Sequence, residues 1–144
     1  MTLKRMLLIA TTVFVGNVMA EPLTVTIDGI KSNQGNIVVQ FYDNKKDWME
    51  EDLERMVHKK VLSAADLQGT TTFDVELNYG EYAIYVYHDK DANGELNSNW
   101  IGIPREPVGC SNNAKGSMGP PKYKDAKFSF NAEQNSHSLT IVEL

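Results

Sequence analysis

The stretch HDKDANGELN contains the residue types and spacings best suited to chemistry in this chain of 144 residues. Asp89, Asp91 and Asn93 place side-chain oxygens at alternating positions, and Gly94 allows the chain to turn sharply after them. The backbone carbonyl of Glu95 adds a further oxygen. Calcium loops use alternating oxygen ligands around a glycine turn, so the two aspartates, Asn93 and Glu95 are candidate calcium ligands.

This loop differs from an EF-hand in two respects. The twelfth position of an EF-hand loop holds a bidentate glutamate, and here that position is Trp100. The segment before the loop alternates like a strand rather than a helix. A calcium site would therefore borrow a carboxylate from elsewhere, and the candidates are Glu95, Glu106 and Asp125. The alternative is a turn without metal, because Asp, Asn and Gly are also the usual turn residues.

Aromatic side chains form the second candidate binding feature. In the run EYAIYVYH, Tyr85 and Tyr87 fall on the face opposite Ile84, so both faces of this strand are non-polar. Trp100 and Tyr123 follow in the chain and would extend a groove for a sugar or an extended peptide. The candidate ligand-binding residues are Tyr85, Tyr87, Trp100, Ser111, Asn112, Asn113 and Tyr123.

The alternative for these residues is structural. Residues 97–124 contain four glycines and four prolines without periodicity, which predicts a long irregular loop. This loop would cover the two tyrosines, with Trp100 and its apolar neighbours turned inward. Ser111, Asn112 and Asn113 would then hold the loop by hydrogen bonds from their side chains to the backbone.

Catalysis has one candidate pair, a Cys110 nucleophile with a His88 base. No third residue that would orient the histidine is identifiable, so we expect a protein that is not an enzyme. A small envelope enzyme with a site near His88, Asp89 and Cys110 is the alternative, and a purely structural envelope component is another. The single cysteine cannot form an internal disulfide, and we expect a buried thiol.

Hydrophobic alternation predicts the elements that must position these residues. Strands are expected over 23–28, 36–43, 71–78 and 81–88, with shorter ones around Phe128 and Leu139. Turn residues between successive runs predict that 23–28 pairs with 36–43, and 71–78 with 81–88. Apolar residues at helical spacing predict a short amphipathic helix over 47–57. The predicted fold is all-β, an immunoglobulin-like or transthyretin-like antiparallel sandwich of about seven strands.

The N-terminus has the pattern of an export signal. Lys4 and Arg5 precede a short apolar run, which is typical of a secretory signal peptide and predicts one over residues 1–20. The remaining residues, 21–144, have the length of a single domain. We therefore expect a periplasmic or secreted protein.

Charge and hydropathy restrict the partners. Without the two basic residues of the signal, 12 basic residues face 19 acidic ones, a net charge of −7, which disfavours nucleic acid. No apolar stretch reaches the roughly 20 residues of a membrane span, so no membrane insertion is expected. We expect an unidentified ligand or an envelope protein as the partner, bound through the 85–124 region, with calcium as the only candidate cofactor.

Several motifs between Tyr79 and Phe130 occur in a fixed order. A strand ends in His-Asp and is followed by an Asp-x-Asn-Gly loop, a Gly-x-Pro-x-Glu element, the run GCSNNAKG and Gly-Pro-Pro. This order resembles a family of small exported bacterial proteins, domain of unknown function 2141. The resemblance implies an immunoglobulin-like or transthyretin-like sandwich in the periplasm or outside the cell, and it implies no particular activity.

Overall fold

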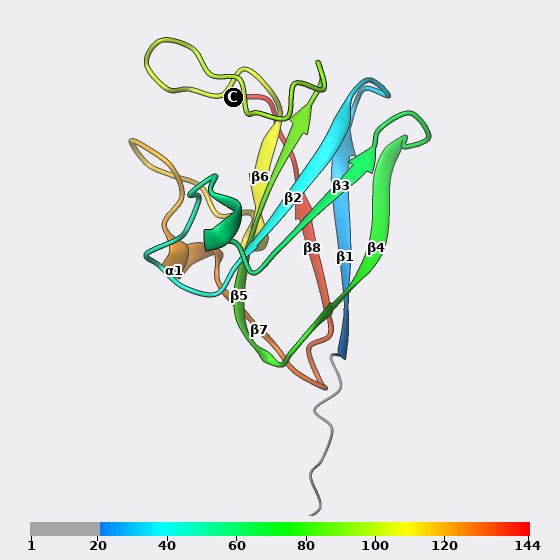
Figure 1. The fold of residues 1–144 in the computed structure, drawn as a ribbon, viewed down its shortest axis with the longest axis vertical. Coiled ribbons are helices and arrows are strands. Elements are labelled where there is room, and N and C mark those ends of the chain that lie inside the picture. The colour runs from blue at the N-terminus through cyan, green and yellow to red at the C-terminus, as the bar shows by residue number, and fades with distance from the viewer. Residues whose placement is uncertain (1–20) are drawn as a thin grey trace, which may run out of the picture.

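Residues 21–144 form two packed β-sheets in the computed structural model, which describes this part of the chain (Figure 1). The strands are β1 (Glu21–Ile30), β2 (Asn36–Tyr42), β3 (His58–Ser63), β4 (Gly69–Leu77), β5 (Gly80–Asp89), β6 (Val108–Cys110), β7 (Phe128–Phe130) and β8 (Ser136–Thr140). The predicted signal peptide, residues 1–20, lies outside the described residues.

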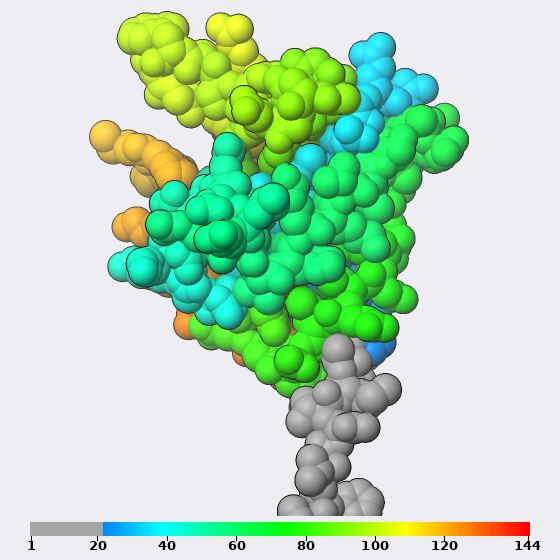
Figure 2. All heavy atoms as spheres, viewed as in Figure 1, coloured from blue at the N-terminus to red at the C-terminus, as the bar shows by residue number. Residues whose placement is uncertain are grey.

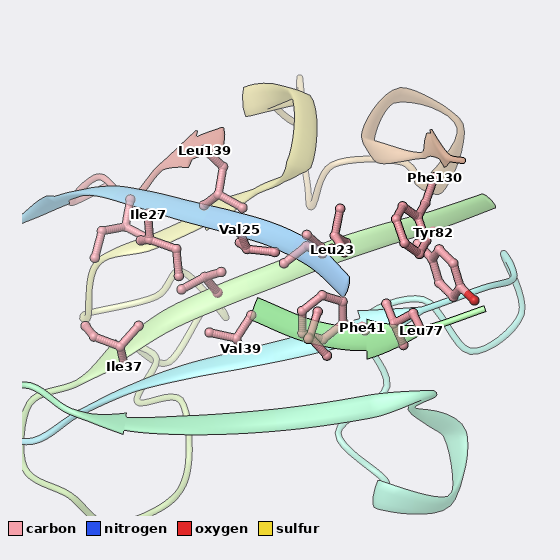
Figure 3. Packing of buried hydrophobic residues seen from close by; sticks show 14 of the residues in the cluster. Leu23, Val25, Ile27, Ile37, Val39, Phe41, Leu77, Tyr82, Phe130 and Leu139 are labelled. Atoms are coloured by element: carbon pink, nitrogen blue, oxygen red, sulfur yellow. The ribbon is translucent and has the colours of Figure 1, made fainter. Parts of the chain in front are cut away.

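The inner faces of the two sheets bury one hydrophobic core (Figure 3). The smaller sheet has the strand order β4-β1-β8, and the larger has the order β3-β2-β5-β6 with β7 also paired to β5. Alternation along β1 turns Leu23, Val25 and Ile27 inward, where they pack against β2 residues such as Val39 and Phe41. The predicted all-β class and sandwich-like arrangement are confirmed, with eight strands in the described residues.

The predicted pairing of successive strands is wrong. β1 pairs with β4 in antiparallel register and with β8 in parallel register, whereas β2 pairs with β3 and β5. The connections between 23–28 and 36–43, and between 71–78 and 81–88, therefore cross from one sheet to the other. Turn residues indicate that the chain reverses, but they do not indicate which sheet it enters. Both inner faces are apolar, so alternation does not decide the pairing either.

The predicted helix over 47–57 is also wrong. Met49 has a φ of 63°, a left-handed conformation that an α-helix cannot contain. Helical structure here is limited to the 3-10 turn η1 (Leu53–Arg55), and the one short α-helix of the described residues is α1 (Tyr123–Ala126). No helix within 21–144 has the length and apolar character needed to cross a membrane.

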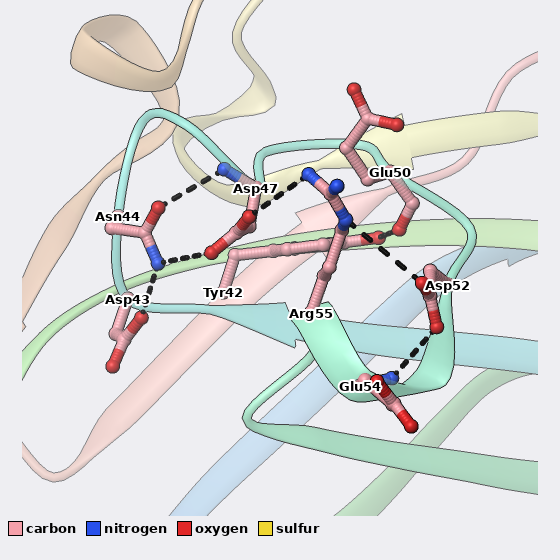
Figure 4. A network of polar contacts seen from close by, with 8 residues as sticks. All are labelled: Tyr42, Asp43, Asn44, Asp47, Glu50, Asp52, Glu54 and Arg55. Atoms are coloured by element: carbon pink, nitrogen blue, oxygen red, sulfur yellow. Dashed lines mark hydrogen bonds and ion pairs between the residues drawn. The ribbon is translucent and has the colours of Figure 1, made fainter.

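Polar side chains fix the connection between β2 and β3 in place of a helix (Figure 4). The Asn44 side-chain oxygen accepts a hydrogen bond from the Asp47 amide at 3.0 Å, and the Asp47 carboxylate pairs with Arg55 at 3.3 Å. The Tyr42 hydroxyl donates to the Glu50 carbonyl at 2.9 Å. Asn and Asp satisfy backbone groups locally, so they favour such turns over a continuous helix.

β5 is buried on both faces, which positions the candidate site. Its residues from Tyr82 to Asp89 are all buried. One face belongs to the core between the sheets, and the other lies under the segments 43–57 and 108–126. Trp48 ties these two covering segments together, because its indole nitrogen donates to the Pro121 carbonyl at 2.9 Å.

Candidate functional site

The loop after β5 folds around the carboxylate of Asp89. This residue ends the strand and is only 1% exposed. Its two oxygens accept hydrogen bonds from the backbone amides of Asn93, at 3.1 Å, and Gly94, at 2.8 Å. Gly94 has a φ of 83°, which glycine adopts without strain. The residue types of this loop therefore build the tight turn that they predict.

Glu106 joins this loop to the segment that follows it. Glu106 is 5% exposed, and its carboxylate accepts hydrogen bonds from the amides of Lys90, at 2.9 Å, and Asn97, at 3.0 Å. The Asn97 side chain donates to Asp91 at 2.9 Å, and this hydrogen bond holds the pKa of Asp91 below its ordinary value. Carboxylate oxygens of Asp89, Asp91 and Glu106 lie within 4.8 Å of one another.

This carboxylate cluster, defined as Asp89, Asp91 and Glu106, contains two of the four predicted calcium ligands and one of the proposed distant carboxylates. The Asn93 side-chain oxygen is instead occupied by the Glu95 amide at 2.9 Å. Glu95 itself is exposed, and its carboxylate is not part of the cluster. The two alternatives for a distant carboxylate, Glu95 and Asp125, are thus not brought into the cluster.

No ion pair within residues 22–144 neutralises the carboxylate cluster. The ammonium of the nearby Lys90 pairs with Glu143 at 2.9 Å instead. Three carboxylates at this spacing suit a hard cation such as calcium. The amide hydrogen bonds that the carboxylates accept also fix the loop by themselves, so the chemistry of the cluster is compatible with either role.

Residues 97–105, here called the apolar hairpin, carry apolar side chains into solvent (Figure 2, yellow-green, projecting from one end of the molecule). The side-chain oxygen of Asn99 accepts hydrogen bonds from the amides of Ile101, at 3.1 Å, and Ile103, at 2.9 Å. Trp100 is 93% exposed, and both isoleucines are also exposed. Trp100 and these neighbours therefore do not turn inward, although the hydrogen bonds give the turn a defined shape.

The predicted aromatic face is covered. Tyr85 and Tyr87 are buried, and Tyr123 packs edge-on against Trp48 with 6.0 Å between the ring centroids. Burial raises the pKa of Tyr85 above its ordinary value and the pKa of Tyr87 to about 12. Among the aromatic residues predicted to bind a ligand, Trp100 alone is accessible.

Ser111, Asn112 and Asn113 form a polar clamp around η2 (Ser111–Asn113), a 3-10 turn. The buried Ser111 hydroxyl accepts a hydrogen bond from the Ile84 amide at 2.9 Å and donates to the Ala126 carbonyl. It thereby ties β5 to α1. This position of Ser111 agrees with the structural interpretation of the sequence, in which the side chain serves the backbone.

The two asparagines of the clamp reach other elements. The Asn112 side-chain amide donates to the carbonyls of Asp125 and Lys127, at 3.1 and 2.9 Å. The Asn113 side-chain oxygen accepts from the Thr140 amide of β8 at 2.8 Å. Both asparagines have positive φ values, 61° and 49°, a conformation that asparagine tolerates better than most residues. The clamp therefore requires asparagine for its backbone as well as for its hydrogen bonds.

A family model described as "Uncharacterized protein conserved in bacteria (DUF2141)" matches residues 25–138. The chain belongs to this family. A search of curated proteins finds no match, and a search of solved structures finds none either. The motifs that indicated DUF2141 now have positions. The His-Asp strand end and the Asp-x-Asn-Gly loop form the turn around Asp89, the Gly-x-Pro-x-Glu element contributes Glu106, and GCSNNAKG contains the clamp.

The structure does not bring His88 and Cys110 together. His88 follows Val86 on the core face of β5, where its Nε2 lies 2.7 Å from the Gln34 carbonyl oxygen. Cys110 pairs with Tyr85 and lies on the other face of the sheet. Burial raises the pKa of the Cys110 thiol to about 11, which disfavours the thiolate that a nucleophile needs.

Sequence reasoning missed two asparagines of this DUF2141 site. Asn97 links the carboxylate cluster through both its amide and its side chain, and Asn99 shapes the tip of the apolar hairpin. The signal was present in the run NSNW, because asparagine commonly binds backbone amides in tight turns.

We predict that Asn112→Ala lowers the free energy of unfolding by about 2–3 kcal/mol, through the left-handed φ and the lost hydrogen bonds. The matched variant Asn112→Gly removes the same hydrogen bonds but adopts positive φ freely, so its loss should be about 1 kcal/mol smaller. Denaturant unfolding of both variants measures the difference. Equal losses for alanine and glycine would show that the backbone conformation at this position contributes nothing.

His137 is a titratable residue in contact with the polar clamp. Its ring stacks on Phe128 with 4.0 Å between the centroids, and its Nε2 accepts a hydrogen bond from the Asn112 amide at 3.1 Å. Burial lowers the pKa of His137 below its ordinary value, since the charged form is poorly solvated there. The folded protein therefore favours the neutral imidazole.

We predict that His137 makes the protein less stable as the pH falls below about 6.5, the pKa expected in the unfolded chain. Below that pH the unfolded chain takes up a proton that the folded chain binds more weakly, so stability decreases until the folded pKa is reached. Unfolding at pH 7.5 and 5.5 should show a larger loss for the natural protein than for His137→Gln. Parallel losses in the two proteins would contradict the assignment.

Proposed function

We propose that this protein is an exported, non-catalytic binding domain of the bacterial cell envelope, with the apolar hairpin as its contact element and calcium as a stabiliser. One observation carries the proposal. The Glu106 carboxylate lies in the carboxylate cluster and also binds the amide of Asn97, the first residue of the apolar hairpin. Any ion held by the cluster would therefore stabilise the base of the element that presents Trp100.

The electrostatics of the carboxylate cluster support a cation. Asp89 and Glu106 are both buried, and like charges within 4.8 Å repel each other unless a cation or hydrogen bonds offset them. Asp91 is exposed and would leave one side of the ion open to water. Calcium accepts such mixed sets of carboxylate and water oxygens, and extracellular calcium sites work at dissociation constants of roughly 10⁻⁴ to 10⁻³ M.

The composition of the apolar hairpin supports a protein partner. Trp100, Ile101 and Ile103 are exposed together, and no charged residue lies between Leu96 and Pro104. Tryptophan is among the residues that contribute most to protein interfaces. The neighbouring tyrosines, which would have extended Trp100 into a platform for a sugar, are buried. We therefore propose a peptide segment or an apolar pocket of an envelope protein as the ligand.

The export part of the proposal rests on the N-terminal sequence. Lys4 and Arg5 followed by a short apolar run fit a secretory signal peptide. Calcium at millimolar concentration is available to exported proteins, and a weak site can be occupied there. Export of the protein would therefore place the weak calcium site where calcium is available.

We predict that millimolar calcium raises the melting temperature of the 21–144 protein, which contains both sheets, by several degrees. At about 10 mM calcium, roughly 10 to 100 times the dissociation constants expected for such a site, the folded state gains about 1.4 to 2.7 kcal/mol. Glu106→Gln should abolish the increase because it removes a charge from the cluster. Glu95→Gln, a change of an exposed acid in the same loop, should keep it. A melting temperature that does not change at any calcium concentration would contradict the calcium part of the proposal.

We predict that the apolar hairpin selects peptides from a displayed random library. Peptides recovered on the 21–144 protein in calcium should be enriched in apolar residues and should bind Trp100→Ser at least about tenfold more weakly, a loss of 1.4 kcal/mol or more. Val61→Ser, which changes an exposed apolar residue on β3, is the matched control and should bind normally. Peptides that bind all three proteins equally would argue against the apolar hairpin as the contact element.

A further inference from the structure

β4 is an edge strand of nine residues with one strand partner among the described residues. It pairs with β1 along its whole length, and Figure 1 shows it at the outer side of the smaller sheet. The other side of such a strand presents backbone N–H and C=O groups in a row, which can pair with another chain.

The edge strands β3 and β4 are protected differently. β3, one edge of the larger sheet, is shorter than β4 and carries Lys59 and Lys60. Lys60 faces inward, with its ammonium 5.1 Å from the centroid of the Phe73 ring, and an inward-pointing charge is a common protection of an edge. β4 has the sequence GTTTFDVEL, with no proline and no lysine. Its only charges, Asp74 and Glu76, point away from the core.

We infer that β4 pairs with β4 of a second copy of this chain, antiparallel, around a two-fold axis at Phe73. This register aligns all nine residues of Gly69–Leu77 with their counterparts, because Phe73 is the midpoint of the strand; the Thr70 amide, however, is already bonded to the Gln68 carbonyl at 2.8 Å. It places Thr72 opposite Asp74 of the second copy, and Thr70 opposite Glu76 of the second copy. Hydroxyl and carboxylate therefore face each other at every charged position.

The same chemistry already joins β4 to its known neighbour. In the β1–β4 pair, Thr24 lies opposite Asp74, and its hydroxyl donates to that carboxylate at 2.7 Å. Thr70 donates to Asp28 in the same way, so its single proton is already used. The Thr72 hydroxyl, which contacts Thr26, is therefore the one able to donate to a carboxylate of the second copy. On the inner side, Phe73 is only partly buried, with the Lys60 ammonium 5.1 Å from its ring centroid, and a second Phe73 across the axis would pack against the exposed part of the ring as an aromatic cross-strand pair.

Other registers are worse. An axis at Asp74 places two aspartates opposite each other, and like charges in that position are destabilising. An axis at Thr72 pairs only residues 69–75 and leaves Glu76 outside the pair. An axis midway between two residues would place inner side chains of one copy opposite outer side chains of the other, on the wrong face of the sheet. The axis at Phe73 is the register that uses the full strand and opposes no acid to another acid.

This inference does not rest on the proposed function, since β4 and the apolar hairpin share no residue.

We expect sedimentation velocity of the 21–144 protein to show a monomer–dimer equilibrium as the protein concentration rises. The concentrations should extend to about 1 mM, because small interfaces are weak. Thr72→Asp places an acid opposite Asp74 in both of the symmetry-related pairs, so it should raise the dissociation constant by roughly 2- to 30-fold. Thr72→Lys should lower it or leave it unchanged. Circular dichroism checks that both variants fold.

Disulfide trapping tests the register without disturbing Phe73. A mixture of Thr72→Cys and Asp74→Cys proteins should form a mixed disulfide faster than either protein dimerises alone, because these positions face each other across the axis. Ser138→Cys, on the same face but in β8, is the control, and the natural Cys110 is buried. A monomer at every concentration, equal effects of Thr72→Asp and Thr72→Lys, or trapping that is no faster for the mixed pair would each overturn the inference.

Discussion

The burial of β5 on both of its faces is the constraint on which the rest of the structure depends. Two packed sheets bury only their inner faces, so the outer face of β5, with Tyr85 and Tyr87, needs a separate cover. The segments 43–57 and 108–126 provide it. Both are irregular over most of their length, so many of their backbone groups lack the partners that a helix or sheet supplies, and asparagine, aspartate and serine side chains satisfy several of them.

The same constraint determines where the polar chemistry lies. β5 ends at a buried Asp89, and a buried carboxylate is costly unless amides or a cation stabilise it. The following loop supplies the amides, and Glu106 returns to the same place from the far side of the apolar hairpin. The aromatic side chains of Tyr85 and Tyr87 lie under the covering segments. The apolar hairpin, whose turn is shaped by Asn99, instead exposes Trp100 and its two isoleucines.

The DUF2141 motifs thus divide into two groups by what their side chains contact. The side chains of GCSNNAKG form hydrogen bonds with the backbone of β5, α1 and β8, and they hold the segment 108–126 over the outer face of β5. Those around Asp89 and Glu106 gather negative charge near the surface, where it can act on an ion. Apart from these motifs, the edge strands of the two sheets differ in charge. β3 carries lysines, whereas the outward charges of β4 are acidic.

The sequence by itself determined the all-β class, the positions of the long strands, the turn around Asp89 and the family, because alternation and turn chemistry are local properties. It named Glu106 as a candidate but could not choose it over Asp125. Strand pairing, the absence of a helix over 47–57, the cover over Tyr85 and the exposure of Trp100 were decided by the tertiary structure. Each depends on which apolar surfaces meet, and residues far apart in the chain determine that together.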